Sequence, residues 1–293
     1  MGKLLDESIT RRCTMQIGGM GPQYTSGVKN ASGALKKTNR QLQKILERLS
    51  TAQRINRASD DAAGLAVSEQ LRSNIRGFKM ASRNVQDAMA ALDIADGAST
   101  EIADMLQRQR ELTVQARNST LTDTDRQSLD AEYQALSQEI ERTAQGAEYN
   151  RQEVANGTGL GSGTAVIQAG PDAGDQMTLP QIDFSASTSG VAGTSIATAA
   201  DATTAFAAIE NALQSLNQQR SSVGATINRF TSAVDNLSVA MVNTQAAESV
   251  LRDQDMAEGM TELIREQLLQ EGGIKSFRRF SELSRNHIMG ILG

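Results

Sequence analysis

The strongest constraint on the fold is a periodic row of residues between Phe206 and Met241. Its members are separated by three or four residues in turn, and all except Arg220 are apolar: Phe206, Ile209, Leu213, Leu216, Arg220, Val223, Ile227, Phe230, Val234, Leu237 and Met241. This spacing places them along one side of an α-helix, like the seam of a coiled coil. The sequence therefore predicts a long helix in which the stem of Arg220 packs in the seam and its head reaches outward, either to pair with a carboxylate of a neighbouring helix or simply to reach solvent.

The composition also favours helices. Only 3% of the 293 residues are aromatic, Trp is absent, and there are 24 glycines but 3 prolines. With so few bulky side chains, helices packed along shallow seams are favoured over a compact globule of sheets. Helical spacing recurs in four more segments: around Leu35–Leu49, from Leu71 to Leu112, after a start signal at Thr122 and Asp123, and from Asp253 to the end, with an interruption at Gly272 and Gly273.

The helical pattern is absent between Val154 and Ala202, where Gly, Ser, Thr and Ala predominate. Two short apolar segments in this region flank turn residues at 171–174, which predicts a β-hairpin near 164–184. Residues 185–204 are expected to be a short linker. The predicted fold class is mainly α, a long antiparallel helical rod or coiled coil with a small β-hairpin region.

Two adjacent acids, Asp60 and Asp61, stand between the first two helical patterns. Negative charge is favourable at a helix N-terminus by ~0.3–1 kcal/mol per exposed residue, and Asp is a preferred capping residue. We therefore expect a helix to begin at about residue 60 and residues 51–60 to form a non-helical connector. The alternative is a solvated kink within one continuous helix.

Histidine and cysteine, which are common in catalytic and metal sites, are nearly absent. His287 is the only histidine, so neither a His-pair metal site nor a Ser/His/Asp triad can be assembled. Cys13 is the only cysteine and cannot form an internal disulfide. The glycine-rich segment at 159–170 lacks the Lys-Ser/Thr of a phosphate-binding loop. We expect a protein that is not an enzyme and that has no cofactor, no metal and no catalytic residues.

Charge and hydropathy narrow the range of partners. The net charge of -5 argues against nucleic acid, because neutralising phosphates requires a basic surplus. No apolar run reaches the ~18 residues of a spanning helix, so no membrane is expected as a partner. At the N-terminus the arginines follow the short apolar patch, the reverse of a secretory signal, so any export is expected to use a route without a cleaved signal peptide.

Two blocks of the sequence resemble bacterial flagellin. The first covers roughly residues 35–170 and includes ILERLSTAQRINRASDDAAGLAVSEQLRSNIRG, ASRNVQDAMAALDIADGASTEI, LQRQRELTVQARN and AEYNRQEVANG. The second covers roughly 205–273 and includes RDQDMAEGMTELIREQLLQEGG. The resemblance implies a secreted subunit of the bacterial flagellar filament that serves motility. The resemblance leaves open whether this filament is external or periplasmic. Only about twenty residues occupy the place of the outer domains that members commonly insert, so the chain resembles a short form.

The resemblance implies a division of the chain into domains. Residues 1–18 are an N-terminal extension, 19–50 pair with 253–293 as the coiled coil of the inner tube, 51–60 are the connector, and 61–252 form the rod domain. Both end segments carry apolar rows on helices that need packing to be stable. Head-to-tail burial that does not close gives a filament. The predicted self-assembly seam comprises Leu35, Leu42, Leu46, Leu49, Met260, Leu263, Phe277, Phe280, Ile288 and Ile291, with Ile45 alongside.

The resemblance also implies partners. The first is the chain itself, in a helical homopolymer; the others are the flagellar export machinery, an export chaperone, the filament cap and the hook-junction proteins. A vertebrate Toll-like receptor recognises such proteins through a patch that corresponds to Arg108, Leu112 and Glu132. Two alternative functions stay open at this point: a hook–filament junction protein and a cell-surface adhesive flagellin homologue.

Overall fold

The computed structural model describes residues 29–185 and 190–292. It contains a helix at 29–51 and the helices α2 (Ala62–Ala116), α3 (Asp123–Gly146), α4 (Ala199–Arg252) and α5 (Met256–Leu292). A short 3-10 helix, η1, covers Gly159–Gly161, and the strands are β1 (Glu148–Tyr149), β2 (Gln152–Glu153), β3 (Val166–Gln168) and β4 (Gln176–Thr178). The fold is therefore mainly α, as predicted. The predicted N-terminal extension and Cys13 lie outside the described residues.

The chain divides into two compact units. The central unit is Leu71–Ala246, and the terminal unit combines Met1–Gln70 with Ala247–Gly293. The described part of the terminal unit is 29–70 and 247–292. No helix within the described ranges is long and apolar enough to cross a membrane.

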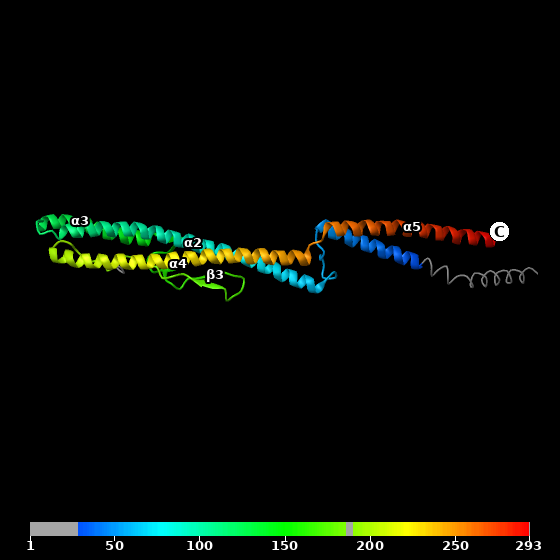
Figure 1. The fold of residues 1–293 in the computed structure, drawn as a ribbon, viewed down its shortest axis with the longest axis horizontal. Helices are drawn as coiled ribbons and strands as arrows, with labels where there is room; N and C mark the ends of the chain where they lie inside the picture. The colour runs from blue at the N-terminus through cyan, green and yellow to red at the C-terminus, as the bar shows by residue number, and fades with distance from the viewer. Residues whose placement is uncertain (1–28, 186–189, 293) are drawn as a thin grey trace, which may run out of the picture. The chain divides into compact units, whose positions relative to one another are not determined.

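The central unit has a continuous apolar core between α2, α3 and α4 (Figure 1). The row from Phe206 to Met241 lies within α4, and its members alternate between buried and half-buried positions, as the spacing predicts. Arg220 is the polar member of this row. Its Nε lies 3.3 Å from Oδ1 of Asp96 on α2, and its Nη2 donates to Oγ1 of Thr100 at 3.3 Å. The predicted carboxylate partner of Arg220 is therefore confirmed.

The start of α3 also matches its sequence signal. Thr122 is the N-cap residue, and it forms a capping box with Asp125 in which each side chain binds the backbone of the other. Arg126 lies just inside the helix and donates from Nε to the carbonyl of Ala116 at 2.9 Å. This buried guanidinium fastens the first turn of α3 to the end of α2.

The predicted β-hairpin is present. β3 and β4 pair antiparallel, with Ile167 opposite Met177. Their connecting loop lies against α2, because a Cβ atom added to Gly77 would come within 2.7 Å of Pro171 Cβ. Asn84 of α2 also donates to the carbonyl of Gln168 at 3.3 Å.

Two further features of the central unit were not predicted. β1 and β2 form a second hairpin whose turn residues, Asn150 and Arg151, have φ angles of 50° and 62°. Two described residues of the expected linker at 185–204 pack in the core: Val191 and Ile196 are buried, and the backbone N–H of Ile196 donates to Asp130 Oδ1 at 2.7 Å. Its last residues belong to α4.

The predicted interruption at Gly272 and Gly273 is wrong, because α5 runs without a break through both residues. Glycine is unfavourable in a helix by ~1 kcal/mol relative to alanine, but tertiary packing can offset this cost. A Cβ atom at Gly273 would lie 2.9 Å from Leu35 Cδ2. The absence of a side chain there permits close packing against the helix at 29–51.

Candidate functional site: the paired terminal helices

The site is built from two helices of the terminal unit and the connectors that follow and precede them. The helix at 29–51 lies beside α5 (Figure 1). Residues 52–61 are non-helical, and residues 253–255 separate α4 from α5. The two connectors bind each other through backbone hydrogen bonds: Arg54 N donates to Arg252 O at 2.7 Å, and Gln254 N donates to Ala52 O at 3.0 Å.

The polar residues of the first connector each have a local role. Asn56 Nδ2 donates to Thr51 Oγ1 at 2.8 Å, at the end of the first helix. Asp61 Oδ1 accepts from Gly64 N at 2.9 Å and so caps α2, which begins at Ala62. Asp60 does not cap this helix; its Oδ1 accepts from Lys44 Nζ at 3.1 Å. Of the two acids predicted to start the helix, Asp61 does so and Asp60 holds the connector to the preceding helix.

The electrostatics of Asp60 follow from these contacts. Burial by itself raises the pKa of its carboxyl, but the hydrogen bonds from Lys44 and from the backbone of Arg57 lower it more. The net result is a pKa below the ordinary value for Asp. Asp60 is therefore charged at neutral pH and helps to define the connector.

Arg252 joins the second connector to the first. Its guanidinium is nearly buried, and Nη1 lies 2.9 Å from Glu69 Oε1 on α2. Its Nε donates to Gln53 Oε1 at 3.2 Å. A single cation thus ties the end of α4 to the first connector and to the first turns of α2.

The two helices pack as an antiparallel pair with close contacts. A Cβ atom at Gly259 would lie 2.8 Å from Leu49 Cδ2, and the matching distance from Gly273 to Leu35 is 2.9 Å. Gln270 also donates to Asn39 Oδ1 at 2.6 Å. Leu35 and Leu49 of the first helix therefore rest on positions of α5 that have no side chain.

The predicted seam residues fall into three groups. Leu35, Leu42, Leu49, Leu263 and Phe277 are half-buried. Leu46 and Met260 are each 48% exposed, whereas Ile45 is buried. Phe280, Ile288 and Ile291 belong to α5, but their side chains lie outside the described residues. The role of all ten in self-assembly stays a prediction.

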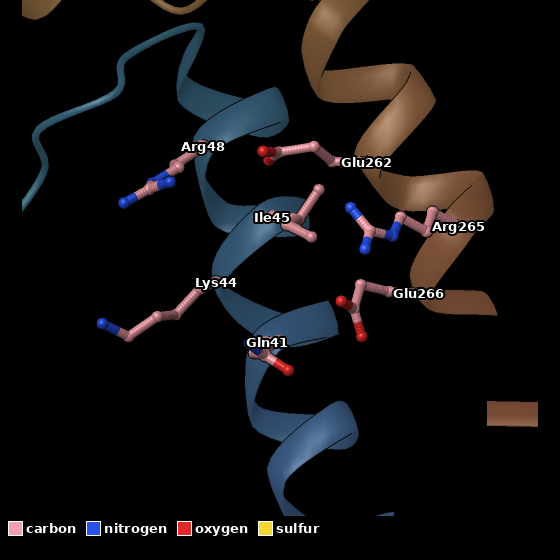
Figure 2. Close-up of a pocket in the computed structure, with 7 residues that line it drawn as sticks. All are labelled: Gln41, Lys44, Ile45, Arg48, Glu262, Arg265 and Glu266. Atoms are coloured by element: carbon pink, nitrogen blue, oxygen red, sulfur yellow. The ribbon is translucent and has the colours of Figure 1, made fainter. Parts of the chain in front are cut away.

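Beside this seam lies a pocket of about 270 Å³ lined mostly by charged side chains, which Figure 2 shows. Its lining residues are Gln41, Lys44, Ile45 and Arg48 from the first helix, and Glu262, Arg265 and Glu266 from α5. Two polar atoms, Arg48 Nε and Glu266 Oε2, are buried and have no hydrogen-bond partner within the described structure. Buried polar groups of this kind normally have a partner.

The outer surface of α5 carries several apolar side chains that the sequence reasoning did not include. Ile264 is 53% exposed and Leu268 is 65% exposed. Together with Met260 they are spaced four residues apart, so they form one row on a face of α5 other than the one that meets the first helix. The four-residue spacing is the signal that could have found them. Four more exposed apolar residues of α5 are Met256, Leu269, Ile274 and Leu283.

The predicted receptor patch belongs to the central unit and differs from the expectation. Arg108 Nη2 lies 2.8 Å from Glu132 Oε1, and both side chains are about half exposed. Leu112 is buried in the core instead of lying at the surface, so it cannot form an exposed patch with Arg108. The spacing of four residues places both on similar sides of α2, but Leu112 packs into the core whereas Arg108 stays at the surface and pairs with Glu132 of α3.

Comparisons with known proteins give a consistent result. Residues 27–159 match the bacterial flagellin N-terminal helical region, and residues 206–286 match the bacterial flagellin C-terminal helical region. The chain is 41% identical to a flagellin of Halalkalibacterium halodurans over 78% of its own length and 84% of the relative. It is 35% identical to the flagellar filament 30.7 kDa core protein of Treponema maltophilum, covering 85% and 91% of the two chains.

Among solved structures, a putative flagellar hook-associated protein from Vibrio parahaemolyticus shares the fold, with a TM-score of 0.55 over 66% of this chain and 99% of the other. Its 15% sequence identity is too low to indicate a shared function. The two family regions and the relatives matched over most of their length are more specific. The chain therefore belongs to the bacterial flagellin family, in a short form, and is a structural subunit of the flagellar filament.

Proposed function

We propose that the terminal unit is the part of the chain that polymerises, and that the apolar row Met260–Ile264–Leu268 of α5 binds neighbouring copies. The observation that carries this proposal is the exposure of these side chains in a helix whose opposite side is already paired. In this assignment, 19–50 with 253–293 form the inner tube, 51–60 form the connector, and 61–252 form the rod. The role is structural and not catalytic.

The energetics support assembly over a stable single chain. Full burial of a large aliphatic side chain contributes ~1.5–3 kcal/mol, and the row leaves about half or more of each side chain exposed. A neighbouring copy that covers this row removes the exposed area from water. Part of the gain offsets the cost of ordering two chains, so several such residues are needed.

The geometry supports an open polymer. The face of α5 that meets the helix at 29–51 is occupied within the chain, and the row Met260–Ile264–Leu268 lies on another face. A surface that binds a different surface of the next copy forms a head-to-tail contact, which repeats as a helical filament unless it closes into a ring. Because this apolar row is exposed in the single chain, we also propose that an export chaperone binds it before export, which takes place without a cleaved signal peptide. At the two ends of the filament, the filament cap and the hook-junction proteins would bind the same row.

The test compares two substitutions at equally exposed positions. Ile264→Ser changes the row on α5, and Val114→Ser changes α2 of the central unit; both side chains are 53% exposed in the parent. The concentration of subunit that remains unassembled after seeding is measured by sedimentation, and the products are examined by electron microscopy. We expect Ile264→Ser to raise this concentration about tenfold, equivalent to ~1.4 kcal/mol per subunit. Equal effects of the two substitutions would contradict the proposal.

Receptor recognition is a separate proposal that rests on Arg108 and Glu132. Their exposed ion pair is a polar surface feature of the kind found at interfaces, where Arg is enriched. A reporter-cell assay with the unassembled chain measures it. Loss of signal on Arg108→Ala, with retention on Arg142→Ala at another exposed ion pair of α3, supports recognition through this surface. A silent parent chain contradicts it.

A further inference from the structure

We infer that Gly259 and Gly273 set the register in which α5 pairs with the helix at 29–51, by receiving Leu49 and Leu35. The two contacts are two heptads apart on both helices, and they run in opposite directions along the chain. One alignment therefore satisfies both of them. The same alignment places Leu42 opposite Glu266, one heptad from each contact.

Leucines alone would leave the register undetermined. Leu35, Leu42 and Leu49 repeat every seven residues, so a shift by one heptad places leucine where leucine was before. The facing positions of α5 remove this ambiguity because they read Gly259, Glu266, Gly273. In the observed register two leucines face glycine and one faces Glu266.

A shift by one heptad in either direction gives fewer leucine–glycine contacts. One shift places Leu42 on Gly259 and Leu35 on Glu266, and the other places Leu42 on Gly273 and Leu49 on Glu266. Each shifted register therefore retains one leucine–glycine contact in place of two and still presses a leucine against the carboxylate. Because a leucine faces Glu266 in all three registers, the registers differ in the number of leucine–glycine contacts, which is two in the observed register and one in each shifted register.

The neighbouring glycine provides an internal comparison. Gly272 has no atom within 4 Å of an added Cβ, whereas Gly273 has Leu35 at 2.9 Å. Glycine weakens a helix at either position. Only at Gly273 does a side chain of the facing helix, Leu35, occupy the space that a Cβ atom would fill. Gly273 therefore contributes to the register, and Gly272 does not.

The register has a consequence for assembly that rests on the proposed function. It fixes where the row Met260–Ile264–Leu268 stands relative to the helix at 29–51. A shifted pair would present the same residues, displaced by about two turns, to a neighbouring copy. Uniform register is then a condition for a regular filament.

Cysteine cross-linking of the full-length chain in a Cys13→Ser background tests the inference. Thr38→Cys with Gln270→Cys reports the observed register, and Thr38→Cys with Leu263→Cys reports a shift by one heptad. In the parent, we expect the first pair to cross-link about tenfold more than the second, as a specified register requires. Gly273→Leu should reduce this ratio severalfold, whereas Gly272→Leu should leave it unchanged. Restoration of the ratio by Leu35→Ala in the Gly273→Leu chain would tie the effect to the contact itself.

The outcomes separate the register from the proposed function. Circular dichroism confirms that each variant keeps its helices, and the cross-linking is performed on the free chain and on seeded filaments. An unchanged ratio in Gly273→Leu overturns the register inference even if filaments grow. Both proposals are supported if Gly273→Leu reduces the cross-linking ratio and Ile264→Ser raises the concentration of unassembled subunit. If Ile264→Ser assembles normally but the ratio depends on Gly273, the register stands and the polymerisation surface is wrong.

Discussion

The central and terminal units differ most in how much apolar surface they bury. Among the described residues, the terminal unit has two buried apolar side chains, Ile45 and Ile55. The central unit contains the continuous core, which includes fully buried Tyr133, Phe184 and Phe230. Among the side chains of α5 that the structure describes, seven large apolar ones are exposed: Met256, Met260, Ile264, Leu268, Leu269, Ile274 and Leu283.

This difference suggests that the two units owe their stability to different contacts. The central unit has a core that can offset the conformational entropy lost on folding. The terminal unit is a pair of helices without such a core, and helices of this kind gain most of their stability from packing. The central unit therefore has its apolar contacts within its own chain, whereas under the proposed function the terminal unit gains further apolar contacts from neighbouring copies.

The largest expected effect comes from the same substitution made in both units. Phe230→Ala removes a fully buried ring from the central core and should lower the free energy of unfolding by ~3–5 kcal/mol. Phe277→Ala removes a half-buried ring from α5 and should lower the free energy of unfolding by less than about 1 kcal/mol in the free chain, since only part of the ring is removed from water. Chemical denaturation measures both. Similar losses at the two sites would show that the terminal unit has a core of its own.

Limited proteolysis of the free chain should expose the same contrast. Regions with few buried contacts open most easily, so both ends should be cleaved at least about tenfold faster than the central unit. Mass spectrometry should find a resistant helical fragment of about residues 55–250. Assembled filaments are the control, because neighbouring copies should protect the ends. If the ends of the free chain resist proteolysis, their order does not depend on assembly.

Much of the central unit could be predicted because its signals are local. The row from Phe206 to Met241 has one period throughout, and Thr122 carries its capping partner three residues away. The second hairpin could not be predicted, because its turn places Arg151 at positive φ, where Gly, Asn or Asp is the usual signal. Leu112 shows another limit: the spacing from Arg108 gives the helical face approximately, whereas burial depends on how the other elements of the core pack on that face.

The site in the terminal unit was less predictable because its contacts are distant in sequence. The spacing of the first helix identifies Leu35, Leu42 and Leu49, but it does not decide between Ile45 and Leu46 as the buried neighbour. Gly273 looked like a helix interruption because the residue that accommodates it, Leu35, lies at the other end of the chain. The exposed row Met260–Ile264–Leu268 of α5 has a helical spacing that the sequence shows. Whether such a row is buried within the chain or exposed depends on the tertiary fold.

Arg220 should contribute little despite its central place in the seam of α4. Its side chain is 34% exposed and that of Asp96 is 45% exposed, so solvent screens the pair. Exposed pairs contribute ~0–1 kcal/mol, and a leucine at this position gains apolar contact. Arg220→Leu should therefore change the free energy of unfolding by less than about 1 kcal/mol, measured by chemical denaturation. A loss of several kcal/mol would mean that the pair is desolvated and that Asp96 needs its partner.

The smallest expected effect is a pH dependence at the connector of the terminal unit. The folded pKa of Asp60 is lowered from its ordinary value of 3.8, so its contribution to stability is present above that value and is lost as pH falls through the folded pKa. Lys44 is mostly exposed, which keeps this contribution small. Thermal depolymerisation of filaments should therefore show a larger drop between pH 5 and pH 3, bounds set at about one unit on either side of the ordinary pKa, in the parent than in Asp60→Asn. Lys44→Met should reduce the same difference, and the double variant should reduce it no further if both act through one ion pair. A full acid response in Asp60→Asn would assign the pH dependence to other carboxylates and leave Asp60 with a role in connector geometry alone.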